Sequence, residues 1–269
     1  MKIWKNTNTL DCYINELKKT VPPSEATVAI IGSKPIDLNI MPNLKAIFKC
    51  GVGTDNIPFE EAEKRGIKII LPSAKTKNFI YEETANFTTF LILNELYKKI
   101  GDLTSWTKEK RVFLFDKKVL VVGQGNIGKL VKEKLQKLVT VKSFDVLENK
   151  DEELEILVRE ADVVTLHIPL TDSTHNFIDE EKISWMKKNS SLVNTSRGPI
   201  VSEDALFDAI NNKKITATFD VFWEEPYRGK LTQFYPERFM MTPHVSSNCV
   251  NFLDNLAQDF TDQLLKQNL

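Results

Sequence analysis

Short apolar runs alternate with helical patterns along most of this 269-residue chain. A run of four to eight apolar residues is typical of a buried strand, whereas apolar residues three or four apart favour an amphipathic helix. These rules predict strands at 28–31, 44–50, 67–71, 119–122, 141–144, 162–167, 191–194, 215–219 and 239–241. They predict helices directly after Gly128 and at 11–19, 58–65, 81–100, 151–160, 179–187, 202–212 and 251–267. The alternation predicts an α/β fold with a doubly wound parallel sheet.

The first hundred residues predict a small parallel α/β domain of their own. The helical pattern at 81–100 is long enough to connect two domains, and Gly101 follows it. A polar stretch at 102–110 then leads towards the strand at 119–122.

That strand ends in Gly123, Gly125 and Gly128, and a helical pattern follows at once. In a G-x-G-x-x-G turn the first glycine permits the tight bend, the second lets the backbone approach a pyrophosphate, and the third permits close helix–strand packing. The next strand ends in Asp145, where a carboxylate accepts hydrogen bonds from ribose hydroxyls and repels a 2′-phosphate. We therefore expect a site for NAD rather than NADP, although ligands such as S-adenosylmethionine also bind turns of this kind.

Net charge, apolar runs and cysteine spacing exclude several classes of function. A net charge of −1 gives no basic surface for nucleic acid or an anionic membrane. There is no signal-peptide pattern, and no apolar run approaches the ~18 residues of a membrane span. Cys12, Cys50 and Cys249 lack metal-ligand spacing, so we expect reduced thiols, no metal and a cytoplasmic protein. Cys50 and Cys249 are interpreted either as reactive thiols or as small buried residues.

Polar and glycine residues collect at the carboxyl ends of the predicted strands, where open α/β sheets bind their ligands. They are Gly51 to Gly53, Gly123 to Gly128, Asp145, His167, Asn194 to Gly198, Asp220 and His244.

Only three histidines are available as acids or bases near neutral pH. His175 lies in a polar loop, and His167 either faces a cofactor or caps a strand end. His244 follows the last predicted strand. Arginine is scarce, with six against thirty lysines, which makes Arg197 at a strand end conspicuous.

The sequence resembles the D-isomer-specific 2-hydroxyacid dehydrogenase family. The matching segments follow the family's order over nearly the whole chain: 50–57 (CGVGTDNI), 122–128 (VGQGNIG), 167–171 (HIPLT) with Thr174, 194–201 (NTSRGPIV), 220–226 (DVFWEEP) and 242–244 (TPH). Several motifs in register are far more specific than the glycine turn alone.

The resemblance implies a catalytic Arg197, Glu225 and His244, and Glu225 fits better than Glu224 because it directly precedes Pro226. His244 would exchange a proton with the substrate oxygen, and Glu225 would fix the imidazole tautomer. Arg197 would bind the substrate carboxylate through its planar fork. Singly, these residues could be a surface ion pair, a solvated acid and a strand-end cap, but the joint match disfavours that interpretation.

The resemblance also implies which residues bind the ligands. Those expected to bind NAD are Gly123, Gln124, Gly125, Asn126, Ile127, Gly128, Asp145, His167, Pro169, Thr174, Thr195, Ser196 and Asp220. The backbone N–H groups around Val52 and Gly53 would hold the substrate carboxylate from the other domain.

In this family, residues 98–244 would form a Rossmann NAD domain. Residues 1–97 and 245–269 would form a smaller, flavodoxin-like substrate domain, with the chemistry in the cleft between the two. The chain departs from the family in leaving no room between Asp145 and Asp162 for the usual extra strand. Its segment 101–115 is also short, which puts a homodimer through the NAD domain in doubt. Ser246, Ser247 and Asn248 replace the usual small residues after His244.

The expected reaction interconverts a D-2-hydroxy acid and its 2-oxo acid. Lys34 is interpreted either as a cation facing a substrate phosphate or as a solvated lysine, so 3-phosphoglycerate is the first candidate substrate. Glyoxylate, hydroxypyruvate and D-lactate are the next candidates. A dinucleotide-sensing corepressor is the alternative from another functional class. An inactive homologue is disfavoured by the intact catalytic residues.

Overall fold

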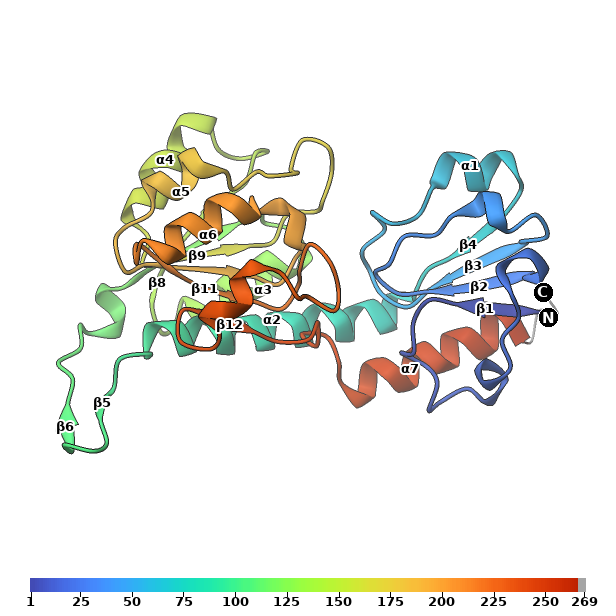
Figure 1. The fold of residues 1–269 in the computed structure, drawn as a ribbon, viewed down its shortest axis with the longest axis horizontal. Coiled ribbons are helices and arrows are strands. Elements are labelled where there is room, and N and C mark those ends of the chain that lie inside the picture. The colour runs from blue at the N-terminus through green and yellow to red at the C-terminus, as the bar shows by residue number, and fades with distance from the viewer. Residues whose placement is uncertain (266–269) are drawn as a thin grey trace. The chain divides into compact units, whose positions relative to one another are not determined.

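The computed structural model describes residues 1–265, and the chain divides into two compact units (Figure 1). The smaller unit combines Met1–Glu83 with the chain from Ser247 onward, and the larger unit comprises Thr84–Ser246. The division falls inside helix α2 (Ala74–Leu96), ahead of the boundary after residue 97 that the resemblance implied. Both units are parallel α/β structures, as the alternating patterns predicted.

The smaller unit has a four-stranded parallel sheet in the order β1-β2-β3-β4. The strands are β1 (Ile3–Lys5), β2 (Val28–Ile31), β3 (Ala46–Lys49) and β4 (Lys68–Ile70). Every residue of β2 and β3 is buried, because apolar clusters cover both faces of the sheet. Helix α7 (Val250–Phe260) contributes to one cluster and helix α1 (Phe59–Lys64) to the other.

The larger unit has a six-stranded parallel sheet in the order β12-β11-β10-β9-β7-β8. Its strands are β7 (Lys118–Val122), β8 (Thr140–Phe144), β9 (Val163–Leu166), β10 (Ser191–Asn194), β11 (Thr216–Phe219) and β12 (Phe239–Met241). The strand order reverses at β7, which lies between β8 and β9. The carboxyl ends of β7 and β9 therefore form the ligand-binding switch point of a doubly wound sheet.

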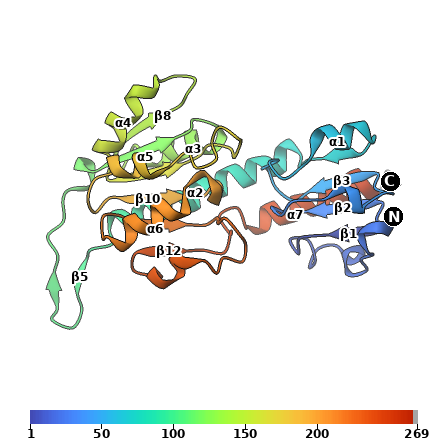
Figure 2. The same cartoon turned by 45° about the horizontal axis from the view of Figure 1, so that its top comes forward.

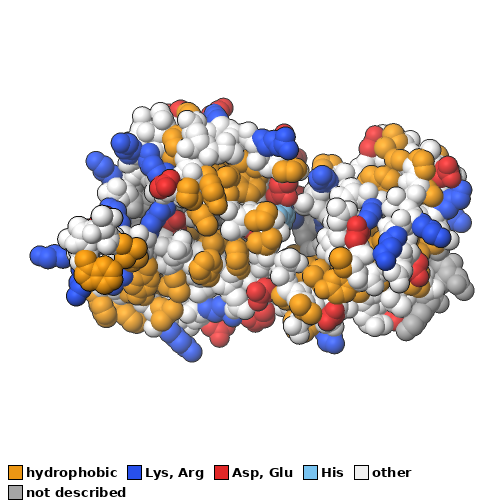
Figure 3. All heavy atoms as spheres, turned by 60° about the horizontal axis from the view of Figure 1, so that its bottom comes forward, with side chains coloured by type: hydrophobic (Ala, Val, Ile, Leu, Met, Phe, Trp, Pro, Cys, Tyr) orange, Lys and Arg blue, Asp and Glu red, His pale blue; other side chains and the backbone are white. Residues whose placement is uncertain are grey.

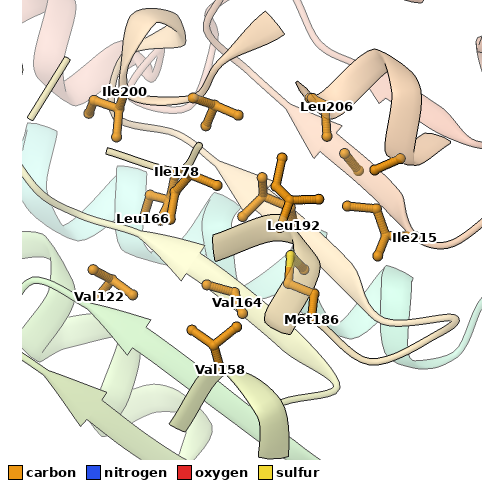
Figure 4. Packing of buried hydrophobic residues seen from close by; sticks show 14 of the residues in the cluster. Val122, Val158, Val164, Leu166, Ile178, Met186, Leu192, Ile200, Leu206 and Ile215 are labelled. Carbon is orange, nitrogen blue, oxygen red and sulfur yellow. The ribbon is translucent and has the colours of Figure 1, made fainter. Parts of the chain in front are cut away.

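Helices cover both faces of this sheet, as Figures 1 and 2 show. On one face, Leu120 and Val122 pack in a cluster that includes residues of α4 (Asp151–Glu160), α5 (Glu180–Trp185) and α6 (Glu203–Asn211) (Figure 4). On the other face, Val119 and Val121 pack with residues of α2 and α3 (Asn126–Leu135). Alternate residues of β7 thus enter opposite cores, as the two-residue period of a strand requires.

Strand β8 forms the edge of the sheet, and only a short turn separates it from α4. The described residues between Asp145 and Asp162 form a turn and α4 but no strand, which confirms the prediction for this segment.

The segment predicted as a polar stretch forms an antiparallel hairpin of β5 (Gly101–Asp102) and β6 (Thr107–Lys108). We call residues 97–115 the arm. Gly101 has φ of +132°, and a Cβ there would lie 2.2 Å from the carbonyl oxygen of Thr107, so the hairpin requires glycine. Its large exposed hydrophobic side chains are Tyr97, Ile100, Leu103, Trp106, Val112, Phe113 and Phe115. Figure 3 shows hydrophobic side chains gathered over this region.

Three other elements differ from the sequence-based predictions. The helix predicted at 11–19 is wrong, because only a 3₁₀ turn at Asn15–Lys18 forms there. Strand β1 was missed because its two apolar residues stand between Lys2 and Lys5 and form no apolar run. The helix predicted at 251–267 is α7 followed by one π turn at Thr261–Leu265, and the last two predicted residues lie outside the described ones. Among the described helices, none has the length and apolar character needed to cross a bilayer.

Candidate active site

The glycine turn is built as the motif requires. Gly123 has φ of +96°, and a Cβ there would lie 2.5 Å from the carbonyl oxygen of His167. A Cβ on Gly128 would lie 2.0 Å from the carbonyl oxygen of Gly123, so this glycine lets α3 approach the turn. A Cβ on Gly125 would meet nothing within 4 Å. The second glycine therefore leaves its backbone open to a ligand, at the N-terminus of α3 where a pyrophosphate would be stabilised.

Asp145 follows β8 and lies beside this turn. Its carboxylate oxygens accept hydrogen bonds from the backbone N–H of Gln124 at 2.7 Å and of Leu147 at 3.0 Å. The N–H groups of Leu147 and Gln124 lower the pKa of the carboxyl group. A fixed carboxylate next to an open glycine turn fits the adenosine ribose of NAD, so the residues present suit this cofactor.

His167 follows β9 and stays neutral. Burial of its imidazole lowers the pKa from 6.5 to about 3, and Nε2 lies 3.0 Å from the Thr165 hydroxyl. Its backbone N–H donates to Val122 and its carbonyl lies against Gly123, so the residue shapes the glycine turn. In the next loop, the Thr174 hydroxyl donates to the carbonyl of Pro169.

The loop after β10 carries Arg197, and several hydrogen bonds hold this loop in place. The Asn194 side chain accepts from the N–H of Ser196 at 2.9 Å and donates to the carbonyl of Arg197 at 2.8 Å. The Ser196 hydroxyl donates to the carbonyl of Leu166 at 2.6 Å, and Thr195 lies 2.9 Å from the Thr88 hydroxyl. Arg197 Nη1 donates to the carbonyl of Ser196 at 2.7 Å. The guanidinium is thus tied to its own loop.

Gly198 lets the Arg197 loop pack against the loop that carries Glu225. A Cβ on Gly198 would lie 2.1 Å from the carbonyl carbon of Phe222. The Phe222 N–H in turn donates to Glu225 Oε1 at 3.2 Å.

Glu225 holds the imidazole of His244. Nδ1 of His244 lies 3.0 and 2.9 Å from the two carboxylate oxygens of Glu225. A carboxylate only accepts hydrogen bonds, so Nδ1 carries a hydrogen and Nε2 is the ring nitrogen left for proton exchange. Both side chains are partly exposed, at 32% for His244 and 25% for Glu225. The pair can therefore perform acid–base chemistry on a bound molecule.

Asp220 holds the backbone on either side of His244. His244 has φ of +52°, a left-handed conformation that costs energy for a residue with a side chain. The fully buried Asp220 carboxylate accepts from the Thr242 hydroxyl at 2.6 Å and from the N–H groups of Val245 and Ser246 at 2.9 Å each. Sequence reasoning had assigned Asp220 to the cofactor and did not identify this support of the His244 backbone.

The substrate contacts expected in the smaller unit lie at its strand ends. Lys34 is exposed in the segment after β2, and Val52 and Gly53 are partly buried after β3. Asn56 donates to the carbonyls of Gly32 and Lys34, while the buried Lys49 ammonium donates to the Gly32 carbonyl. Sequence reasoning did not single out Lys49, or Asn56 within the 50–57 segment, because these hydrogen-bond partners lie 17 to 24 residues away in the chain.

Cys50, which directly follows β3, is not a candidate nucleophile. Desolvation raises the pKa of the partly buried Cys50 thiol to about 12, so it is protonated at neutral pH. Among the side chains that the structure describes, no cluster of three or more potential metal ligands occurs.

Comparison with known proteins identifies the family. Residues 92–246 match the family model of the NAD binding domain of D-isomer specific 2-hydroxyacid dehydrogenases, and residues 12–109 match that of their catalytic domain. A glyoxylate reductase from Thermofilum pendens is 31% identical over 90% of this chain and 78% of its own length. A hydroxypyruvate reductase from Thermotoga maritima is 28% identical over 94% of this chain and 88% of its own.

Comparison with solved structures leads to the same family. A D-lactate dehydrogenase from Aquifex aeolicus, complexed with NAD and lactic acid, is 25% identical with a TM-score of 0.81, covering 100% of this chain and 95% of its own. These relatives are enzymes, which disfavours the corepressor interpretation. The chain therefore belongs to the family of NAD-dependent, D-isomer specific 2-hydroxyacid dehydrogenases.

Proposed function

We propose that this dehydrogenase reduces a small 2-oxo acid, glyoxylate or hydroxypyruvate, with His244 as the proton donor. The observation that carries the proposal is the contact between His244 Nδ1 and both oxygens of Glu225. It fixes the ring and leaves Nε2 for the substrate.

Reduction adds a hydride to C2 of the 2-oxo acid and a proton to its oxygen. Bound NADH supplies the hydride. His244 would hold the proton on Nε2 and release it to the carbonyl oxygen, while Glu225 stabilises the imidazolium through Nδ1. In the reverse direction His244 would take the proton from the hydroxyl group.

Arg197 would bind the substrate carboxylate and polarise the carbonyl. A guanidinium suits this task because it donates two parallel hydrogen bonds in one plane. Its loop is held by Asn194 and Ser196, so the guanidinium is presented from a fixed backbone.

The cofactor would lie along the glycine turn. The backbone from Gln124 to Gly128 would contact the pyrophosphate, and Asp145 would accept hydrogen bonds from the adenosine ribose. His167, Pro169, Thr174, Thr195, Ser196 and Asp220 remain predictions as NAD contacts, as do Lys34, Val52 and Gly53 as substrate contacts.

The names of the relatives support a small substrate, since the reductases described above act on glyoxylate or hydroxypyruvate. A phosphorylated acid is the second candidate because Lys34 is exposed after β2 and has an ammonium available to an anion.

The test measures NADH oxidation by the purified protein with glyoxylate, hydroxypyruvate, pyruvate and 3-phosphohydroxypyruvate. We expect the highest kcat/KM with glyoxylate or hydroxypyruvate. A preference for the phosphorylated acid that disappears in Lys34→Ala would favour the second candidate. Absence of turnover with all four acids would contradict the proposal.

We also propose that the arm mediates a homodimer. The exposed hydrophobic side chains of the arm include Trp106 at 80% and Leu103 at 79% exposure. A two-stranded hairpin alone is marginally stable in water, and apolar patches of this kind mark protein interfaces. A cytoplasmic location remains a prediction from the sequence.

A further inference from the structure

Helix α2 presents buried polar side chains to the sheet of the larger unit. Thr84, Thr88 and Glu95 are all buried, although a helix against a sheet usually buries an apolar face. Buried polar groups must find hydrogen-bond partners, and such bonds are directional. Polar contacts therefore fix the position of α2 more tightly than apolar packing alone would.

Glu95 makes the first of two polar anchors. Its carboxylate accepts from the hydroxyls of Ser191 at 2.8 Å, Thr216 at 2.9 Å and Thr218 at 2.7 Å. Burial acts to raise the pKa of this carboxyl group, but the nearby Lys98 ammonium and the three hydroxyl donors bring it below its ordinary value. The carboxylate thus ties α2 to the neighbouring strands β10 and β11.

Thr88 makes the second anchor, and its donors and acceptors can be assigned. The Thr88 hydroxyl donates its only hydrogen to the carbonyl of Thr84, at 2.7 Å. In its 2.9 Å contact with the Thr195 hydroxyl, Thr88 must then be the acceptor. The Thr195 hydroxyl is therefore the donor. Both residues are buried, at 0% and 7% exposure.

The two anchors hold opposite ends of one strand. Thr88 and Glu95 are seven residues apart, about 10 Å along a helix. Their partners Thr195 and Ser191 are four residues apart, about 13 Å along a strand. The helix is therefore bonded at both ends of β10 and fixed in register.

The Thr195 contact lies directly before the Arg197 loop. The guanidinium of Arg197 donates to the carbonyl of Ser196, the residue after Thr195. Any shift of Thr195 therefore moves the backbone oxygen that holds the guanidinium.

We propose that Thr88 is a positioning residue for Arg197, acting through the hydroxyl of Thr195. Thr88 itself is assigned no contact with substrate or cofactor. Its role is to hold the start of the Arg197 loop in the position from which the guanidinium binds the substrate carboxylate. The inference rests on the proposed function, because it assigns that carboxylate to Arg197.

The test compares Thr88→Val, which removes the hydroxyl but keeps the branched shape, with Thr88→Ser, which keeps the hydroxyl. Thr89→Val is the matched control, because the Thr89 hydroxyl donates to the carbonyl of Ala85 one residue further along the same helix. For each variant we would measure KM and kcat for hydroxypyruvate and glyoxylate, the Kd for NADH and the melting temperature.

We expect Thr88→Val to raise KM for the 2-oxo acid roughly 2- to 10-fold, the range of one lost neutral hydrogen bond, with the Kd for NADH unchanged. Thr88→Ser and Thr89→Val should retain the wild-type KM. If Thr88→Val does not fold, Thr88→Ala removes the same hydroxyl without adding a methyl group in its place and should raise KM in the same way.

Equal KM values in Thr88→Val and Thr89→Val would overturn the inference, as would a change confined to melting temperature. Wild-type protein without turnover would instead overturn the proposed function, and the inference with it. The two failures are distinguished by whether the wild-type protein is active.

Discussion

At the residue scale, the candidate site depends on groups held before any ligand arrives. The ring of His244 is held by Glu225, and its strained backbone is held by the three hydrogen bonds of Asp220. Preorganisation of this kind lowers the reorganisation needed during proton transfer. His167 is not a candidate for the proton donor, because its lowered pKa of about 3 leaves the imidazole neutral at pH 7.

His167 should make the protein sensitive to acid. Its pKa is about 3 in the folded chain against the ordinary 6.5 of an unfolded chain, so below pH 6.5 the unfolded chain binds more protons. The stability contribution is complete above pH 6.5 and is lost as pH falls towards 3. Between pH 7.5 and 5, wild-type protein should lose about 2 kcal/mol more unfolding free energy than His167→Gln in urea titrations. Parallel losses in the two proteins would contradict a neutral His167 in the folded chain.

Asp145 should set the choice of cofactor. Asp145→Ala removes the charged acceptor beside the glycine turn, so we expect the Kd for NADH to rise roughly tenfold and the discrimination against NADPH to relax. Fluorescence titration with both cofactors measures this. Glu148→Ala, which removes an equal charge from the same loop, is the control and should bind NADH as wild type does. A wild-type protein that binds NADPH more tightly would show that the assignment of NAD is wrong.

Sequence motifs single out the candidate residues of the site but not the contacts that hold them in place. The motifs around Arg197, Glu225 and His244 are local, so their order along the chain is readable directly. The support of His244 by Asp220 spans 25 residues, and the contact of Thr88 with Thr195 spans 107. Nothing in the local pattern of a threonine indicates a partner so distant in the chain.

At the element scale, predictions succeeded where burial alone shapes the pattern. Strands β10 and β12 have the predicted bounds: β10 is buried throughout, and Phe239 of the edge strand β12 packs in the same apolar cluster. Helix α2 begins seven residues earlier than predicted, because its N-terminus is held by Asp259 of α7. That carboxylate accepts from the N–H of Ser73 and the hydroxyl of Thr76. This cap joins residues more than 180 positions apart, beyond the reach of a local pattern.

Residues 102–110 of the arm were predicted as a polar stretch because Leu103 and Trp106 are the only large apolar residues among them. Leu103 and Trp106 are three residues apart with no further apolar residue in the stretch, a pattern too sparse for a buried strand or an amphipathic helix. The structure instead exposes these side chains on a hairpin.

The arm should control assembly. Leu103→Glu combined with Trp106→Glu places charges in the proposed interface, so we expect dimeric protein to become monomeric in sedimentation experiments. Ile156→Glu, at an exposed hydrophobic residue of α4, is the control and should remain dimeric. A monomeric wild-type protein, or arm variants that remain dimeric, would refute the proposed interface.

At the scale of the whole molecule, the sequence predicted the fold class because both sheets follow one rule. Parallel strands covered on two faces are apolar throughout, and their carboxyl ends collect the polar and glycine residues of a site. The lack of a further strand between β8 and α4 could also be predicted, because too few residues separate Asp145 from α4. The boundary between the two units inside α2 could not be predicted, because the helical pattern continues across it.

The central claim is that His244 supplies the proton for reduction of a 2-oxo acid. The most direct test measures hydroxypyruvate and glyoxylate reduction by wild-type protein and by His244→Gln, together with the Kd for NADH of each. We predict that turnover falls by roughly 10²- to 10⁴-fold while NADH affinity stays nearly unchanged. Parallel loss of turnover and NADH binding would show that His244 supports the structure, and undiminished turnover would show that another group supplies the proton.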